Sequence, residues 1–155
     1  MKLFIPLIVF CLLFSSAMLY AETNVEKFTT IDSTKGAKIN MYVYERAKEV
    51  VRQNPILLVH GFNSSGETWR KKDNNYVKQL TQNGYDVIVI DMRGNKVDID
   101  GDHKVDTPVV GDSWNFGVSD LGDDVGIAIH QGIEYLNSNL AGRNYTKADI
   151  ITHST

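Results

Sequence analysis

Apolar and polar residues alternate on both sides of a short polar segment near residue 35. After this segment, Ile39, Met41 and Val43 alternate with Asn40, Tyr42 and Tyr44. Before it lie β-branched and aromatic residues, and the segment itself, residues 33–36, contains a glycine. Alternation with a period of two on both sides of a Gly-containing turn is typical of a β-hairpin. We therefore predict an antiparallel hairpin that turns at residues 33–36.

Further along the chain, three short apolar runs show no such alternation. They are "ILLVHG" (56–61), "YDVIVIDMRG" (85–94) and "ADIITHS" (148–154). Continuous apolar runs of this length are typical of strands that are buried on both faces, as in a parallel sheet. We predict that each run contains one such strand.

Helical spacing appears between these runs. A short amphipathic helix is predicted to carry Tyr76, Val77 and Leu80 and to stop at Asn83–Gly84, where glycine suits the C-terminal left-handed position. A second helix is predicted to start at Ser119–Asp120. Apolar residues follow in it at nearly every fourth position: Leu121, Val125, Ile129, Ile133 and Leu136. The glycines at 122, 126 and 132 are expected to allow close packing on a sheet, and residues 62–70 are expected to form a loop.

The order strand, helix, strand, helix, strand is that of an α/β layered sheet, here preceded by an antiparallel hairpin. Such sheets bind ligands at the carboxyl ends of their strands. Three tripeptides with chemically versatile residues fall there: His60-Gly61-Phe62, Arg93-Gly94-Asn95 and His153-Ser154-Thr155.

Composition limits the alternatives. The chain has 155 residues, 43% hydrophobic and 23% charged, which is typical of one globular domain. Its net charge of -3, without a Lys/Arg stripe, gives no electrostatic basis for binding nucleic acid. Cys11 is the only cysteine, so no disulfide is expected.

Residues 1–21 have the features of a secretory signal: Lys2, an apolar stretch, then small residues and a plausible cut after Ala21. An uncleaved membrane anchor through residues 3–21 is the alternative, because the apolar run approaches the ~18 residues that can span a bilayer. We expect a secreted, periplasmic or extracellular protein whose residues 22–155 form the domain.

Two further patterns are expected to have no catalytic role. Asp98, Asp100, Asp102 and Asp106 resemble a calcium loop, but the EF-hand glycine and final glutamate are absent, so a solvated acidic loop is predicted. Asn63 and Asn144 match the N-glycosylation pattern, which matters only in a eukaryotic source.

The segment "ITHST" places a serine directly after a strand. A serine on a sharp strand-to-helix turn presents its hydroxyl above the sheet, in the pattern G-x-S-x-G. Thr152 stands in place of the first glycine, and an ordinary Ser–Thr helix cap is the alternative interpretation. The His60-Gly61 turn favours the nucleophile, because backbone amides of Phe62 and Thr155 are expected to form an oxyanion hole beside Ser154. His60 is expected to brace that loop rather than act as the base, which follows the serine in this arrangement.

Four segments in this order resemble the N-terminal half of the α/β-hydrolase superfamily, and most closely its acid lipase and esterase group. They are "PILLVHGFNSSGETW", "NGYDVIVIDMRGN", "SWNFGVSDLGDD" and "ITHST". The resemblance implies that Ser154 is the nucleophile, that Phe62 and Thr155 donate to the oxyanion, and that His60 and Gly61 support the loop. It also implies a fold truncated at the nucleophile turn, because the acid and the histidine of the triad follow the serine in this superfamily.

The implied function is hydrolysis of carboxylic esters or lipids by acyl transfer to water, without metal or cofactor. The substrate would be a small ester or lipid, with association with a lipid surface as a further option and no nucleic-acid partner. The 155-residue chain by itself is expected to be inactive. An acyltransferase or peptidase on the same fold, or a non-catalytic protein of this fold, remains the alternative.

Overall fold

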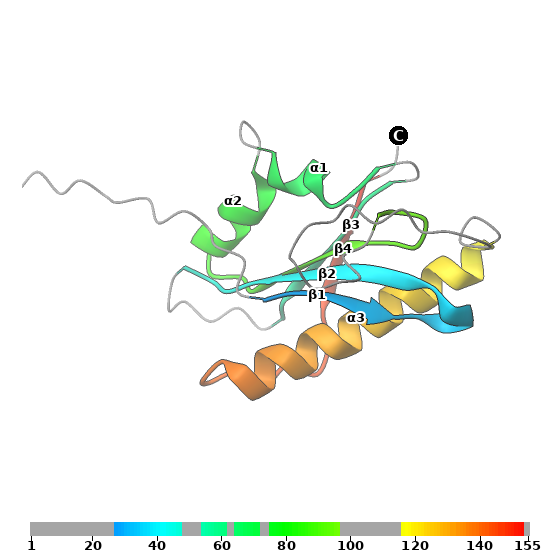
Figure 1. Ribbon diagram of the computed structural model, residues 1–155. Coiled ribbons are helices and arrows are strands. Elements are labelled where there is room, and N and C mark those ends of the chain that lie inside the picture. Colours follow the sequence, from blue (N-terminus) through cyan, green and yellow to red (C-terminus); the bar gives the residue numbers. More distant parts are fainter. Residues whose placement is uncertain (1–26, 48–53, 62–63, 72–74, 97–115, 154–155) are drawn as a thin grey trace, which may run out of the picture.

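The computed structural model describes residues 27–47, 54–61, 64–71, 75–96 and 116–153 (Figure 1). Their strands form one sheet in the order β1-β2-β4-β3-β5. The strands span Lys27–Asp32 (β1), Lys38–Tyr44 (β2), Ile56–Val59 (β3), Val87–Asp91 (β4) and Asp149–Thr152 (β5). The predicted signal or anchor, residues 1–21, lies outside the described residues.

The predicted hairpin is confirmed. β1 and β2 pair antiparallel, and a single 3-10 turn, η1 (Thr34–Gly36), joins them. Lys35 and Gly36 have φ values of 57° and 71°, in the left-handed region that a tight connection uses. β2 also pairs antiparallel with β4, whereas β3 pairs parallel with β4 on one side and with β5 on the other. The sheet is thus mixed, with its parallel part formed by the three predicted apolar strands.

Helices cover both faces of the sheet, so the molecule has three layers (Figure 1). One face is covered by α1 (Glu67–Arg70) and α2 (Tyr76–Gln82), and the other by α3 (Val118–Asn139). Alternate residues of β3 divide between the faces: Leu57 packs with the α3 core and Leu58 with the α1–α2 core. Both are fully buried, which explains why this strand shows no polar alternation.

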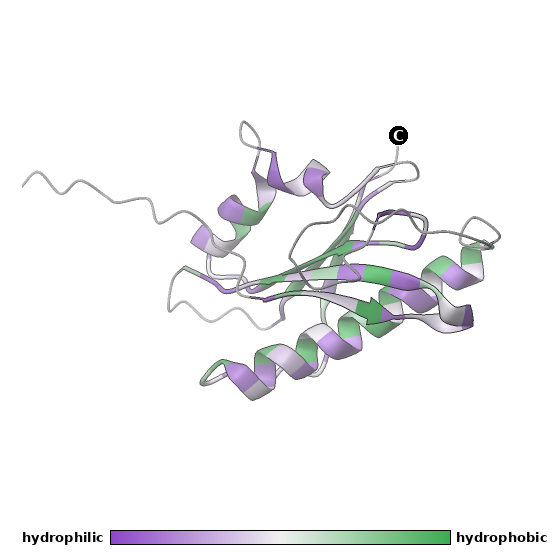
Figure 2. Cartoon of the chain, in the orientation of Figure 1, coloured by the Kyte–Doolittle hydropathy of each residue, from purple (hydrophilic) through white to green (hydrophobic). Residues whose placement is uncertain are grey.

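The helix predictions hold with local differences. α2 ends where predicted, with Gly84 at φ 88°. The predicted loop at 62–70 is wrong for residues 67–70, where α1 forms one helical turn that buries Trp69. α3 begins at Val118 after the N-cap Gly117, slightly earlier than the predicted start. Figure 2 shows polar and apolar positions alternating along this helix, as expected for one that packs on a sheet on one side.

The prediction of a strand buried on both faces is wrong for β5, whose residues are exposed or half-buried. β5 lies at the edge of the described sheet, beside β3, and its side chain at Ile150 is 48% exposed. Within the described ranges, no helix combines the length and apolar character needed to cross a bilayer.

Candidate active site

Three strand ends meet at one edge of the sheet. Because β4, β3 and β5 are parallel neighbours, the residues that follow them emerge on the same side. The backbone N–H of His153, just after β5, donates to the Val59 carbonyl at 3.1 Å. The sequence-predicted residues His60, Gly61 and His153 are therefore brought together, whereas Phe62, Ser154 and Thr155 lie outside the described residues.

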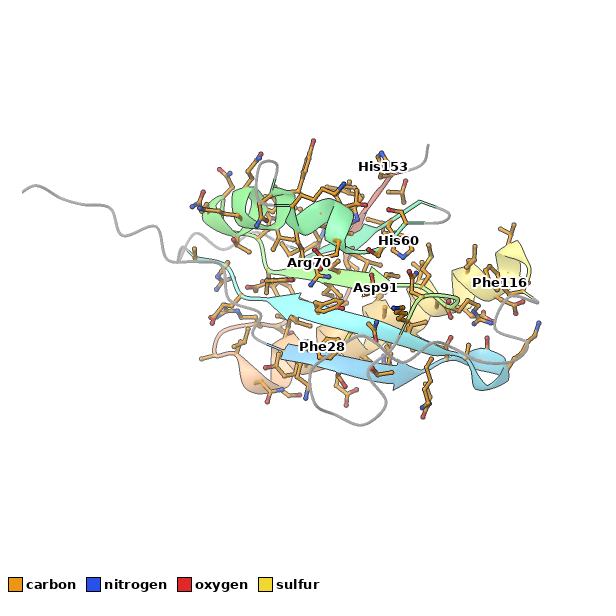
Figure 3. All side chains as sticks on the ribbon, turned by 45° about the horizontal axis from the view of Figure 1, so that its top comes forward. Phe28, His60, Arg70, Asp91, Phe116 and His153 are labelled. Atoms are coloured by element: carbon orange, nitrogen blue, oxygen red, sulfur yellow. The ribbon has the colours of Figure 1, made fainter. Side chains whose placement is uncertain are left out.

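His60 is buried, 5% exposed, and both of its ring nitrogens have partners (Figure 3). Its Nε2 accepts from the Met92 backbone N–H at 3.1 Å and lies 3.3 Å from the Asn95 amide nitrogen. Its Nδ1 lies 2.8 Å from the Gly61 carbonyl oxygen. A neutral ring with its proton on Nδ1 satisfies all of these contacts. His60 therefore links the loop after β4 to the turn after β3.

Gly61 is held from a second side. The Ser64 N–H donates to the same Gly61 carbonyl at 3.1 Å. The Ser64 hydroxyl lies 2.6 Å from that of Thr68 at the start of α1. The turn after β3 is thus tied both to His60 and to the following helix.

His153 occupies a different environment. Its side chain is exposed, and its ring lies edge-on to Trp69, with 6.1 Å between ring centroids and an interplanar angle of 87°. Trp69 also packs edge-on to Tyr76 at 5.7 Å. The end of β5 therefore rests on the aromatic residues of α1 and α2.

Asp91, which the sequence interpretation missed, is a buried carboxylate at the end of β4 (Figure 3). It accepts hydrogen bonds from the Gly66 N–H, from the Tyr42 hydroxyl at 3.1 Å and from the Asn40 amide at 3.3 Å. Burial, with the Asp91 charge as the next cause, raises the pKa of Tyr42 well above its usual range. An aspartate that closes the apolar run "VIVID" was the only signal in the sequence.

Gly66 approaches this carboxylate closely. A Cβ at Gly66 would lie 2.7 Å from Val89 Cγ1 and 3.1 Å from Asp91 Oδ1. Glycine is therefore required for α1 to start directly on the sheet. Asp91 thus fixes the first turn of α1, on which Trp69 supports the end of β5.

A pocket of about 330 Å³ lies beside this group. Tyr42, Arg70, Asp91 and Asn95 are among the residues that line it. The Arg70 guanidinium stacks over the Tyr42 ring at 4.0 Å and pairs with Glu67 at 2.7 Å. Since Asn95 also contacts His60, the pocket adjoins the His60–Gly61 turn.

A second buried group, the Arg93 cluster, comprises Arg93, Asp124, Ser33 and Thr34. Arg93 Nη2 and Nε donate to the Asp124 carboxylate at 2.6 and 3.0 Å, and the Arg93 backbone N–H does so at 3.1 Å. Nη2 also donates to the hydroxyls of Ser33 and Thr34 at 3.1 and 3.0 Å. Hydrogen bonds to Asp124 are the main cause of the raised pKa of Arg93. The cluster joins the loop after β4 to α3 and to the hairpin turn.

The described residues contain no group of three or more His, Cys, Asp or Glu side chains arranged to hold a metal ion. The acidic segment with Asp98 to Asp106, and Asn63, lie outside the described residues. Asn144 is exposed.

Comparison with known proteins agrees with this architecture. Residues 54–124 match the family model described as the alpha/beta hydrolase fold. Among the curated proteins, none matches significantly. The match to the family model includes β3, α1, α2, β4 and the start of α3.

Three solved structures are similar in fold. A monoglyceride lipase from Saccharomyces cerevisiae has 17% identity and a TM-score of 0.55, over 86% of this chain and 36% of its own. A Pyrococcus furiosus esterase has 15% identity and a TM-score of 0.51, over 84% and 40%. Epoxide hydrolase A from Mycobacterium thermoresistibile has 17% identity and a TM-score of 0.50, over 83% and 31%.

At these identities, the solved structures carry an argument about fold only. The chain also spans less than half the length of each of them. The matched family model and the shared fold nevertheless agree with each other and with the mixed sheet described above. The described part of the chain therefore has the α/β-hydrolase fold, and residues 54–124 match the family model of that fold.

Proposed function

We propose that the protein containing this chain is a serine hydrolase that cleaves carboxylic esters or lipids, with Ser154 as its nucleophile. The supporting observation is the contact from the His153 N–H to the Val59 carbonyl at 3.1 Å. It sets the residue that precedes Ser154 against the end of β3, next to the His60–Gly61 turn. Two of the similar structures are of an esterase and a monoglyceride lipase.

The proposed reaction is acyl transfer in two steps. The Ser154 hydroxyl attacks the ester carbonyl carbon while a histidine accepts its proton, and the alcohol leaves with that proton. Water then attacks the acyl-enzyme and releases the acid. Backbone amides of Phe62 and Thr155 would stabilise the oxyanion in both steps. This chemistry needs no metal ion.

Neither described histidine near this edge fits the role of the base. His60 is buried with both ring nitrogens hydrogen-bonded, which suits the bracing role proposed for it. His153 is exposed and packs on Trp69. We propose that the triad acid and histidine follow Ser154 in the full-length protein, in the order that the superfamily uses.

An activity-based probe tests the nucleophile. We expect a fluorophosphonate to label the full-length protein and not to label the Ser154→Ala variant. Ser138 is an exposed serine on α3, so the Ser138→Ala variant serves as the control and should still be labelled. Hydrolysis of p-nitrophenyl esters should fall at least about 10³-fold in Ser154→Ala. Equal labelling of wild type and Ser154→Ala would refute the assignment. Labelling without hydrolysis, but with acyl transfer to added alcohols or cleavage of peptides, would favour the alternative acyltransferase or peptidase.

We also propose export through residues 1–21. Mass spectrometry of the protein from its native host should find a mature N-terminus at Glu22. Recovery of the intact N-terminus in the membrane fraction would favour an anchor through residues 3–21 instead.

A further inference from the structure

The Arg93 cluster lies next in the chain to a residue that contacts the proposed site. Arg93 is fixed to Asp124 both through its guanidinium and through its backbone N–H. The preceding residue, Met92, donates its own N–H to His60 Nε2 at 3.1 Å. Immobilising the backbone at Arg93 therefore restrains the position of the adjacent Met92, whose N–H holds the His60 ring.

The remaining contacts carry this restraint to the turn. Asn95 donates to the Met92 carbonyl at 3.1 Å while its amide nitrogen lies 3.3 Å from His60 Nε2, so two donors of the same loop converge on one ring nitrogen. With Nε2 accepting, Nδ1 bears the proton and donates to the Gly61 carbonyl. Because a peptide unit is planar, donors on the Gly61 carbonyl also restrain the orientation of the peptide unit to which it belongs.

We propose that Arg93 is a positioning residue for the His60–Gly61 turn. It acts on this turn through Met92 and His60. The inference rests on the proposed hydrolase function, in which Phe62 supplies an oxyanion donor. Asp124 and the hydroxyls of Ser33 and Thr34 hold the guanidinium, so α3 and the hairpin turn both contribute to the alignment. Arg93 itself does not touch the reacting atoms.

A second buried ion pair provides a matched control. Arg143 donates to Asp86 through Nε at 3.1 Å, at the amino end of β4. Arg93 and Arg143 have side chains 3% and 8% exposed, and their aspartates are fully buried. Replacing either arginine by lysine keeps the positive charge and removes the planar guanidinium group with its several N–H donors. The two variants therefore remove similar interactions at opposite ends of the same strand.

The first test compares ester hydrolysis by the two full-length variants. Arg93→Lys should lower kcat about tenfold with KM within about twofold, because misaligned oxyanion donors act on the transition state. Arg143→Lys should leave kcat within about twofold at a similar loss of thermal stability. Ser33→Ala, a milder change that removes one partner of Arg93, should lower kcat about threefold. Equal kcat values for the two lysine variants would overturn the proposal.

A double-mutant cycle tests the route. If Arg93 acts through His60, Arg93→Lys should add almost nothing to the loss of kcat already caused by His60→Gln. If the loss of kcat in the double variant equals the product of the two single losses, Arg93 does not act through His60.

Hydrogen exchange separates this inference from the hydrolase proposal. The Ser64 N–H bonds the Gly61 carbonyl, and its exchange should become about fivefold faster in Arg93→Lys but not in Arg143→Lys. Unchanged exchange at Ser64 in Arg93→Lys overturns the inference whatever Ser154→Ala does. Full activity in Ser154→Ala refutes the hydrolase proposal, while the exchange result still decides the role of Arg93.

Discussion

At Gly132, α3 packs directly against the sheet. A Cβ at this position would lie 2.5 Å from Ile88 Cδ1 and 3.0 Å from Cγ1. Ile88 is fully buried, so its side chain has little room to move away. At Gly126 on the same helix, a Cβ would meet nothing within 4 Å. The expectation that all three glycines allow close packing is therefore correct for Gly132 and wrong for Gly122 and Gly126.

This contrast predicts that a Gly→Ala substitution has opposite effects on stability at the two positions. Gly126→Ala should stabilise the protein by up to about 1 kcal/mol, the gain in helix propensity. Gly132→Ala makes the same gain but should be destabilising by about 1 kcal/mol net, because overpacking costs about 1–3 kcal/mol. Thermal denaturation of the full-length protein measures both. A higher Tm in both variants would contradict the close approach at Gly132.

Asp91 gives a second prediction about one residue. Its Oδ1 accepts from the Gly66 N–H and its Oδ2 from Tyr42 and Asn40. Asp91→Asn leaves one accepting oxygen and directs an amide N–H at other donors. We therefore expect the free energy of unfolding to fall by about 2–3 kcal/mol. Tyr42→Phe removes one donor and should cost about 1 kcal/mol. Urea unfolding checks the order, and an equal or smaller loss for Asp91→Asn would be inconsistent with this geometry.

At the scale of elements, the N-terminus of α3 depends on Asp120. Its carboxylate accepts from the Gly117 N–H at 2.9 Å and pairs with Lys35 of the hairpin turn at 2.8 Å. The hydrogen bond from Lys35, then that from the Gly117 backbone, lowers the pKa of Asp120 below the usual value for an aspartate. Asp120 therefore ties the start of α3 to η1.

The lowered pKa sets the sign of a pH effect. A carboxylate with a depressed folded-state pKa stabilises the folded protein above its unfolded pKa, and this contribution is lost as the pH falls through the folded value. Asp120→Asn should therefore be less stable than wild type at pH 7, with a deficit that shrinks below about pH 3.8. Denaturant midpoints between pH 3 and pH 7 measure it. A deficit that does not change with pH would contradict the charged role of Asp120.

The elements show what sequence patterns can predict. The hairpin and α3 were predictable because their apolar residues recur with periods of two and nearly four, and the parallel strands because they are short continuous apolar runs. α1 was missed because four residues, "ETWR", are too few to show a period. Asp91 and the pairing of Arg93 with Asp124 were also missed, since their partners lie far along the chain and burial of a charge leaves no local pattern.

At the scale of the whole molecule, buried polar groups hold both ends of β4. The Arg93 cluster and Asp91 lie at its carboxyl end, beside the proposed site. At its amino end lies the Asp86 cluster, which comprises Asp86, Arg46, Arg143 and Tyr145. In it Asp86 accepts from the Arg46 N–H at 2.7 Å and from the Tyr145 hydroxyl at 2.6 Å. This cluster joins the end of β2 to the connection between α3 and β5.

Tyr145 makes this junction sensitive to alkali. Burial, followed by the hydrogen bond to Asp86, raises the pKa of Tyr145 from 10.0 to about 12. As the pH rises above 10.0, the unfolded chain loses the phenolic proton while the folded protein keeps it. The unfolded state then binds fewer protons, so stability falls with pH until the folded tyrosine also ionises.

Tyr145→Phe isolates this contribution. At pH 7 to 9 the variant should be less stable than wild type by a constant amount of about 1–2 kcal/mol, because Asp86 loses a donor. Between pH 10 and 12 the difference should narrow, since only the wild type carries the titrating hydroxyl. Chemical denaturation of both full-length proteins across this range gives the difference directly. A gap that stays constant to pH 12 would mean that Tyr145 ionises equally in the folded and unfolded protein, and that the Asp86 cluster does not keep its phenol protonated.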